Sequence, residues 1–195
     1  GKTEIALRAA FRVVLGNKRV LILAPTTILV NQLYSSFHAR LSPHAVNVEM
    51  VSRFRSAKKN KMVQENILLK RNDILVGTHS LLNNDIYMKN IGLLIIDEEH
   101  RFGVQQKEKI KCYKENVDVL SMSATPIPRS LNLALSGIYS ISLLQTPPLM
   151  RLPIITYVHY FNEQTIQRAI LFEIERGGQV YFVHNKIKSI EHITS

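Results

Sequence analysis

The chain has 195 residues, 46% of them apolar, and its 25 Lys and Arg against 15 Asp and Glu give a formal charge of +10. This composition supports a packed core and argues against intrinsic disorder, and the length allows one domain and the beginning of another. The positive charge favours a polyanionic partner, although a solubilising surface gives the same sum.

Cysteine content and apolar run length exclude further classes. Cys112 is the single cysteine, so the chain holds neither an internal disulfide nor a Cys-rich zinc site. No apolar run approaches the roughly 18 residues of a membrane span, so we expect no membrane segment and a cytoplasmic location. The chain starts with Gly1-Lys2-Thr3 and carries no export signal, so we expect an excerpt of a longer protein.

Short β-rich runs alternate with amphipathic stretches along most of the chain. Strands are expected over residues 20–24, 46–51, 73–76, 93–97, 117–122 and 139–144. Helices are expected over 4–15, 27–40 and 56–70, with Ser56 as the cap of the last. Most of the strands are continuous apolar runs, which is typical of strands covered on both faces. The order predicts an α/β fold with a parallel sheet between helices.

The alternation breaks at residues 146–153, where three prolines predict a linker. Residues 1–145 would then form a first domain and residues 154–195 the beginning of a second. A strand over 154–160, a helix over 163–176 and a strand over 179–184 are expected in this second part.

The first three residues, Gly1-Lys2-Thr3, lead directly into the first expected helix. They match the end of a phosphate-binding loop, in which backbone N–H groups surround the phosphates, Lys neutralises them and Thr ligates magnesium. Lys2 and Thr3 would hold those two roles. The triplet alone also occurs by chance.

Acidic residues follow the apolar strand over 93–97. Ligands of open α/β sheets bind at such strand ends, where Asp97 could hold a metal and Glu98 could orient an attacking water. A solvated acidic strand end remains the simple alternative.

Small hydroxyl residues follow the next expected strand, at Ser123-Ala124-Thr125. Their hydroxyls could hydrogen-bond the acids of the neighbouring strand, although a Ser/Thr turn is the better explanation of the triplet taken alone. The order of the three pieces, each at a strand end or before a helix, favours one common site.

This series resembles motifs I, Ia, Ib, II and III of the superfamily 2 helicases. The matching segments are Gly1-Lys2-Thr3, Pro25-Thr26-Thr27, Gly77-Thr78-His79, Asp97-Glu98-Glu99-His100 and Ser123-Ala124-Thr125. Residues 100–104 and 124–129 are similar to the branch that comprises transcription-repair coupling factors and RecG-type branched-DNA helicases. Residues 52–58 and 92–100 are closer to the coupling factors, because RecG-type proteins usually have Gln where Glu99 stands.

The resemblance implies a RecA-like fold, followed by the start of a second RecA-like domain, and an ATP hydrolase that moves along double-stranded DNA. It implies that Gly1, Lys2 and Thr3 bind ATP, that Thr3 and Asp97 hold Mg²⁺, and that Asp97, Glu98 and His100 support hydrolysis. Ser123 and Thr125 would couple the nucleotide state to the grip on DNA. Residues 178–185 resemble motif IV of the second domain.

The resemblance also implies partners. Pro25, Thr26, Thr27, Gly77, Thr78 and His79 would contact DNA, while RNA polymerase and excision-repair proteins would bind through domains outside this chain. The basic residues between Arg53 and Lys61 form either a DNA contact or a solvated face. The motifs carrying the arginines that reach the transferred phosphate lie beyond Ser195, so we expect feeble hydrolysis by these 195 residues alone.

Three alternatives compete with a DNA translocase of the coupling-factor type. A RecG-type branched-DNA helicase uses the same chemistry. A non-catalytic nucleic-acid-binding module would not need the Asp97-Glu98 pair. An unrelated kinase or GTPase explains Lys2-Thr3 but gives no purpose to Ser123-Ala124-Thr125.

Overall fold

The computed structural model describes residues 1–52, 56–69, 71–113, 117–124, 140–144, 146 and 154–186. The chain divides into two units, Gly1–Leu149 and Met150–Ser195. The division falls within residues 146–153, where the sequence predicts a linker, and of that segment only Thr146 is described.

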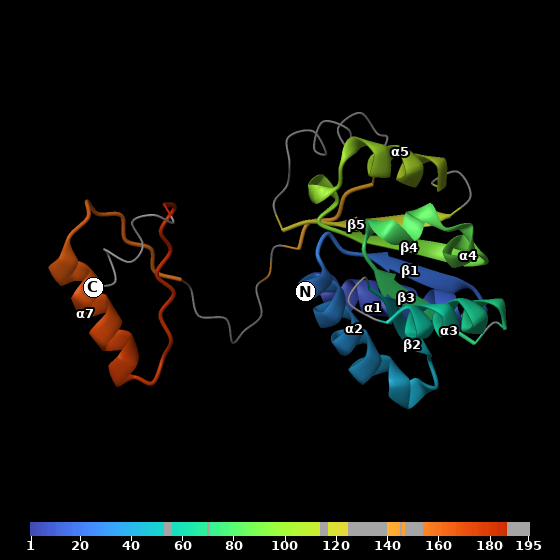
Figure 1. The fold of residues 1–195 in the computed structure, drawn as a ribbon, viewed down its shortest axis with the longest axis horizontal. Helices are drawn as coiled ribbons and strands as arrows, with labels where there is room; N and C mark the ends of the chain where they lie inside the picture. Colours follow the sequence, from blue (N-terminus) through green and yellow to red (C-terminus); the bar gives the residue numbers. More distant parts are fainter. Residues whose placement is uncertain are drawn as a thin grey trace. The chain divides into compact units, whose positions relative to one another are not determined.

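A five-stranded parallel sheet forms the centre of the first unit (Figure 1). In spatial order its strands are β2 (Val48–Val51), β3 (Ile74–Gly77), β1 (Arg19–Leu23), β4 (Ile91–Asp97) and β5 (Asp118–Met122). Every residue of β1 and β3 is buried, as expected of continuous apolar runs covered on both faces. The first five predicted strands and the parallel α/β fold class are confirmed.

Helices cover both faces of this sheet. On one face, α1 (Lys2–Leu15) and α2 (Thr27–Leu41) bury Ala6, Ala10 and Phe37 against the sheet. The other face is covered by α3 (Ala57–Leu68), α4 (Asp85–Met88), α5 (Val104–Tyr113) and the 3₁₀ helix η2 (His79–Asn83). The first three helices match the predicted ones, whereas α4 and α5 were not predicted.

Side-chain caps fix where two of these helices begin. The Thr26 hydroxyl accepts a hydrogen bond of 3.3 Å from the Leu29 N–H at the start of α2. The Ser56 hydroxyl accepts one of 3.4 Å from the Lys59 N–H at the start of α3, which confirms Ser56 as the cap. Ala24 and Pro25 alone separate Thr26 from the end of the buried strand β1.

The strand register aligns the loops at the carboxyl edge of the sheet. Leu23 at the end of β1 lies opposite Gly77 of β3 and Ile96 of β4, and Asp97 lies opposite Met122 of β5. The residues that follow β3, β1, β4 and β5 therefore succeed one another along a single edge, where ligands of parallel sheets bind.

The second unit contains α7 (Glu163–Glu175), whose first turn is capped by Asn162, with Oδ1 accepting from the Thr165 N–H at 3.0 Å. The predicted helix is confirmed, but the strands predicted over 154–160 and 179–184 are wrong, because these residues pair with no strand in the described part of the chain. The strand predicted over 139–144 is wrong for the same reason across its described residues 140–144. An apolar run forms a strand only where a neighbouring strand accepts its hydrogen bonds.

Among the helices that the structure describes, none has both the length and the apolar composition needed to cross a membrane.

Candidate active site

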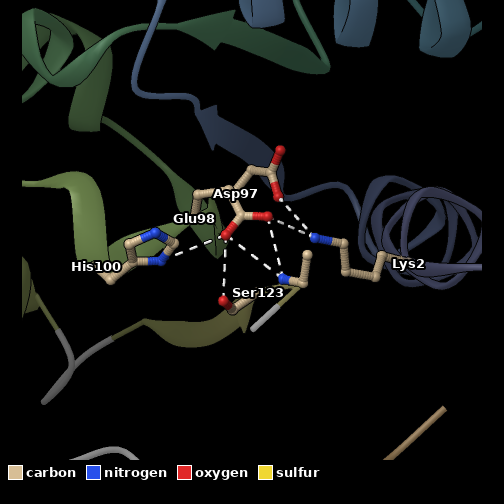
Figure 2. A network of polar contacts seen from close by, with 6 residues as sticks. Lys2, Asp97, Glu98, His100 and Ser123 are labelled. Atoms are coloured by element: carbon tan, nitrogen blue, oxygen red, sulfur yellow. Dashed lines mark hydrogen bonds and ion pairs between the residues drawn. The ribbon is translucent and has the colours of Figure 1, made fainter. Parts of the chain in front are cut away.

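The carboxylate of Glu98 is the centre of a polar network at the ends of β4 and β5 (Figure 2). Its Oε1 lies 2.8 Å from Nζ of Lys2, in the first turn of α1. On its other side, Oε2 lies 3.3 Å from Nδ1 of His100, in the 3₁₀ helix η3 (Glu99–Arg101). Residues 96 positions apart, Lys2 and Glu98, are thus brought into direct contact.

Two donors from the segment after β5 complete this network. The Ser123 hydroxyl donates to Glu98 Oε2 at 3.1 Å, and the backbone N–H of Ala124 donates to Oε1 at 3.1 Å. The hydroxyl of Ser123 therefore bonds an acid of the neighbouring strand, in the way the sequence pattern suggests. The Ala124 amide was not predicted, because a backbone donor leaves no trace in the residue type.

Glu98 adopts a left-handed backbone conformation, with φ 52° and ψ 53°. This conformation costs a non-glycine residue about 1–2 kcal/mol, and such strained positions cluster at functional sites. The Glu98 N–H donates to the Met122 carbonyl at 2.8 Å, so the strained residue is held by backbone and side-chain contacts to the β5 side. Nothing in the sequence indicates this conformation.

Asp97 lies beside the network, with Oδ1 3.8 Å from Lys2 Nζ. Burial raises the pKa of Asp97 above its ordinary value, the charge of Lys2 opposes this rise, and the neighbouring Glu98 adds to it. A divalent cation beside this half-buried carboxylate would supply positive charge that favours its ionised form.

The pKa of Glu98 shifts in the opposite direction. Burial alone would raise it, but the hydrogen bonds from Lys2, the Ala124 amide and Ser123, with the charge of Lys2, lower it below its ordinary value. Ionised Glu98 therefore stabilises the fold above its ordinary pKa, and this contribution is lost as the pH falls through the lowered pKa. The contribution of Asp97 is present below its ordinary pKa and is lost as the pH rises through its raised pKa.

His100 touches Glu98 without a good hydrogen bond. Its Nδ1 is buried and has no hydrogen-bond partner among the described residues, although Glu98 Oε2 lies 3.3 Å away.

Thr3 and Gly1 lie next to the network but do not join it. Thr3 is exposed in the first turn of α1, and Gly1 precedes this helix, with its carbonyl accepting from the Glu4 N–H at 3.2 Å. The described residues contain no group of three or more His, Cys, Asp or Glu side chains able to hold a metal. A magnesium ion held by Thr3 and Asp97 would therefore need further ligands from phosphate and water, which is how proteins usually bind it.

The two threonine-bearing turns predicted to contact DNA follow β1 and β3, which are adjacent strands of the sheet. Ala24, just before Pro25, donates its N–H to the Gly77 carbonyl at 3.0 Å. Thr26 and His79 are exposed, and Thr78 shares a 2.8 Å hydrogen bond with the hydroxyl of Ser80. These turns, with Thr27, follow β1 and β3, whereas the Glu98 network follows β4 and β5.

Two predicted features lie wholly or partly outside the described residues. Thr125 is not described, so only Ser123 of the predicted coupling pair is placed. Of the basic run, Arg53 and Arg55 are not described, while Lys58, Lys59 and Lys61 are exposed on α3.

Comparison with known proteins assigns the class. Residues 1–134 match the DEAD/DEAH box helicase family, and the chain belongs to this family. The structure of RecG bound to a three-way DNA junction aligns over 99% of this chain and 26% of that chain, with a TM-score of 0.73 and 31% identity. The Pyrococcus furiosus Hef helicase domain aligns over 71% of this chain and 31% of that chain, with 24% identity and a TM-score of 0.51, and supports the fold alone.

Three similar curated proteins share a name. The transcription-repair-coupling factors of Haemophilus influenzae and Escherichia coli are 52% and 49% identical over 98% of this chain. That of Bacillus subtilis is 47% identical over 98%. The chain spans 16–17% of the length of these relatives. The resemblance to the coupling-factor branch and the RecA-like fold are confirmed.

Proposed function

We propose that this chain is part of the motor of an ATP-dependent translocase on double-stranded DNA, of the transcription-repair-coupling type. In this proposal ATP and Mg²⁺ are the cofactors, and the whole protein displaces stalled RNA polymerase and recruits excision-repair proteins through other parts of its chain. The relatives named transcription-repair-coupling factor support this partner set. The work would be done in the bacterial cytoplasm, next to the nucleoid.

The contact between Lys2 and Glu98 carries the proposal. A lysine at the start of a helix and two carboxylates at a strand end are the groups needed to bind a triphosphate and activate water. In the structure, Glu98 forms an ion pair with Lys2. The phosphate oxygens of a bound triphosphate would replace Glu98 as the partner of Lys2. Glu98 could then orient water. Gly1 and Thr3 would complete the phosphate site, and Thr3 and Asp97 would hold Mg²⁺.

Ser123 and Ala124 would respond when Lys2 changes its partner from Glu98 to phosphate. Both donate to the Glu98 carboxylate, so a change in the position of Glu98 must alter their segment. His100 would stabilise the ionised Glu98 from the opposite side. We assign Ser123, with Thr125, to coupling, and Asp97, Glu98 and His100 to hydrolysis.

DNA would bind at the turns that follow β1 and β3. The N–H groups of the first turn of α2 lie beside exposed Thr26, and a helix N-terminus is a favourable environment for a backbone phosphate. Pro25, Thr27, Gly77, Thr78 and His79 line the same edge of the sheet. We propose these contacts for the sugar-phosphate backbone, which suits movement that does not depend on sequence.

Displacement of a third strand tests the proposal. A short oligonucleotide bound in the major groove of linear duplex DNA is incubated with the full-length protein and ATP, or with a non-hydrolysable analogue. We expect the protein to release the third strand with ATP but not with the analogue, and we expect the duplex to stay paired. Rapid ATP turnover without release would contradict translocation.

The same assay distinguishes the alternatives. Turnover that depends on a three-way junction, and not on linear duplex, would favour a RecG-type helicase, a possibility supported by the structural match. Duplex binding with no turnover on either DNA would favour a non-catalytic module.

These 195 residues alone should turn ATP over feebly, since removing an arginine that reaches the transferred phosphate lowers the rate about a thousandfold or more.

A further inference from the structure

Phe102 links the turn that carries Glu98 to the turn that follows β3. It lies one residue after η3 and is 6% exposed, in the core between the sheet and α3, α4 and α5. Its ring meets the ring of His79 edge to face, with centroids 6.3 Å apart and planes at 85°. His79 begins η2 and is exposed, so a buried ring supports one at the surface.

The backbone between Glu98 and Phe102 is short and hydrogen-bonded. The Arg101 N–H donates to the Glu98 carbonyl at 2.9 Å, and the Phe102 N–H donates to the Glu99 carbonyl at 3.1 Å. This single 3₁₀ turn restricts how far the strained Glu98 and the buried ring of Phe102 can move independently. A change in the backbone of Glu98 is therefore transferred to the position of Phe102.

The turn that receives the ring is also held tightly. Gly77, at the end of β3, is packed so closely against Leu81 that an added Cβ would lie 2.5 Å from a Leu81 side-chain carbon. Leu81 is fully buried, and Asn83 at the end of η2 accepts a 2.8 Å hydrogen bond from Lys109 of α5. With Gly77 and Leu81 fixed, the exposed ring of His79 is the part of this turn that Phe102 can shift.

We propose that Phe102 is a positioning residue that transmits the state of the Glu98 turn to His79, and so couples ATP turnover to the grip on DNA. The proposal rests on the proposed function, since it takes the turn after β3 as a DNA contact. It requires no contact between Phe102 and either nucleotide or DNA.

The test uses the full-length protein with Phe102→Leu, which keeps an apolar side chain in the core but removes the ring. Phe37→Leu is the matched control, because Phe37 is fully buried under the opposite face of the sheet. ATP turnover is measured with and without duplex DNA at saturating ATP. We expect Phe102→Leu to lower the DNA-stimulated rate about two- to tenfold, the range set by an edge-to-face ring pair, with the basal rate and the KM for ATP within twofold of wild type.

A double-mutant cycle with His79→Ala separates coupling from general destabilisation. If the two rings act as one unit, Phe102→Leu adds no further loss of stimulation in a protein that already carries His79→Ala. The proposal would be overturned if the losses of DNA stimulation in the two single variants multiplied in the double variant. Equal losses of stimulation in Phe102→Leu and Phe37→Leu would also overturn it. A wild-type protein that duplex DNA does not stimulate would instead refute the proposed function.

Discussion

Glu98→Gln is expected to lower the rate of ATP turnover by about a hundredfold to ten-thousandfold, the usual contribution of a group that handles a proton in the transition state. Glutamine keeps the size of the side chain, but its single amide oxygen can replace only one of the two carboxylate oxygens that accept from Ser123 and Ala124, and it cannot take a proton from water. Single-turnover hydrolysis with saturating ATP and duplex DNA measures this step directly.

Nucleotide binding should be retained, or strengthened, in Glu98→Gln. The carboxylate of Glu98 competes with phosphate for Lys2, and a neutral amide competes less. The matched control is Glu99→Gln, one residue further along, whose side chain makes no ion pair with the residues that the structure describes. Equal turnover by Glu98→Gln and Glu99→Gln would remove Glu98 from its proposed role.

Arg19→Met is expected to destabilise the sheet by about 2–4 kcal/mol, since it removes charged hydrogen bonds from buried carbonyl groups. Arg19 begins β1 and is 6% exposed. Its guanidinium donates to the carbonyls of Asn72 at 3.1 Å, Lys89 at 2.9 Å and Tyr87 at 3.5 Å. It thereby joins the segments that lead into β3 and β4, at the end of β1 away from the candidate active site.

Burial lowers the pKa of Arg19, and the charge of Asp73 opposes this change. A guanidinium stays protonated in proteins, so Arg19 keeps its donors. Hydrogen exchange at the β1 and β3 amides of the full-length protein measures the free energy of local opening. Arg19→Lys should fall between wild type and Arg19→Met, because Lys keeps the charge and loses the planar fork. The control is Arg8→Met, whose side chain is 78% exposed, and a loss no larger than in this control would contradict the prediction.

Continuous apolar runs predicted the sheet well. The strands β1 to β5 lie within two residues of the predicted ends. The buried strands β1 and β3 fit the rule that a strand covered on both faces is rich in apolar residues. Apolar runs also led to wrong strand predictions at residues 154–160 and 179–184, where no partner strand is present among the described residues. Helix α5 was missed because Ile110 is its single buried residue, and one apolar position gives no periodicity.

The residue types at the candidate site were predictable, and their contacts were not. Motif order placed Lys2 and the acids that end or follow β4 in one group, but it could not indicate that Lys2 binds Glu98 directly. The left-handed backbone of Glu98 and the donor at Ala124 belong to the main chain, which the residue letters do not report. Arg19 follows Lys18 in the sequence and has the pattern of a surface residue, although its guanidinium is buried.

The affinity for duplex DNA in different nucleotide states tests the central claim most directly. The full-length protein is titrated onto linear duplex with no nucleotide, with ADP and with a non-hydrolysable ATP analogue. Coupling between the Glu98 network and the turns after β1 and β3 predicts that the Kd for duplex differs at least about fivefold between the analogue-bound and nucleotide-free protein, with duplex changing the Kd for the analogue by the same factor. Identical duplex affinities in all three states would contradict it.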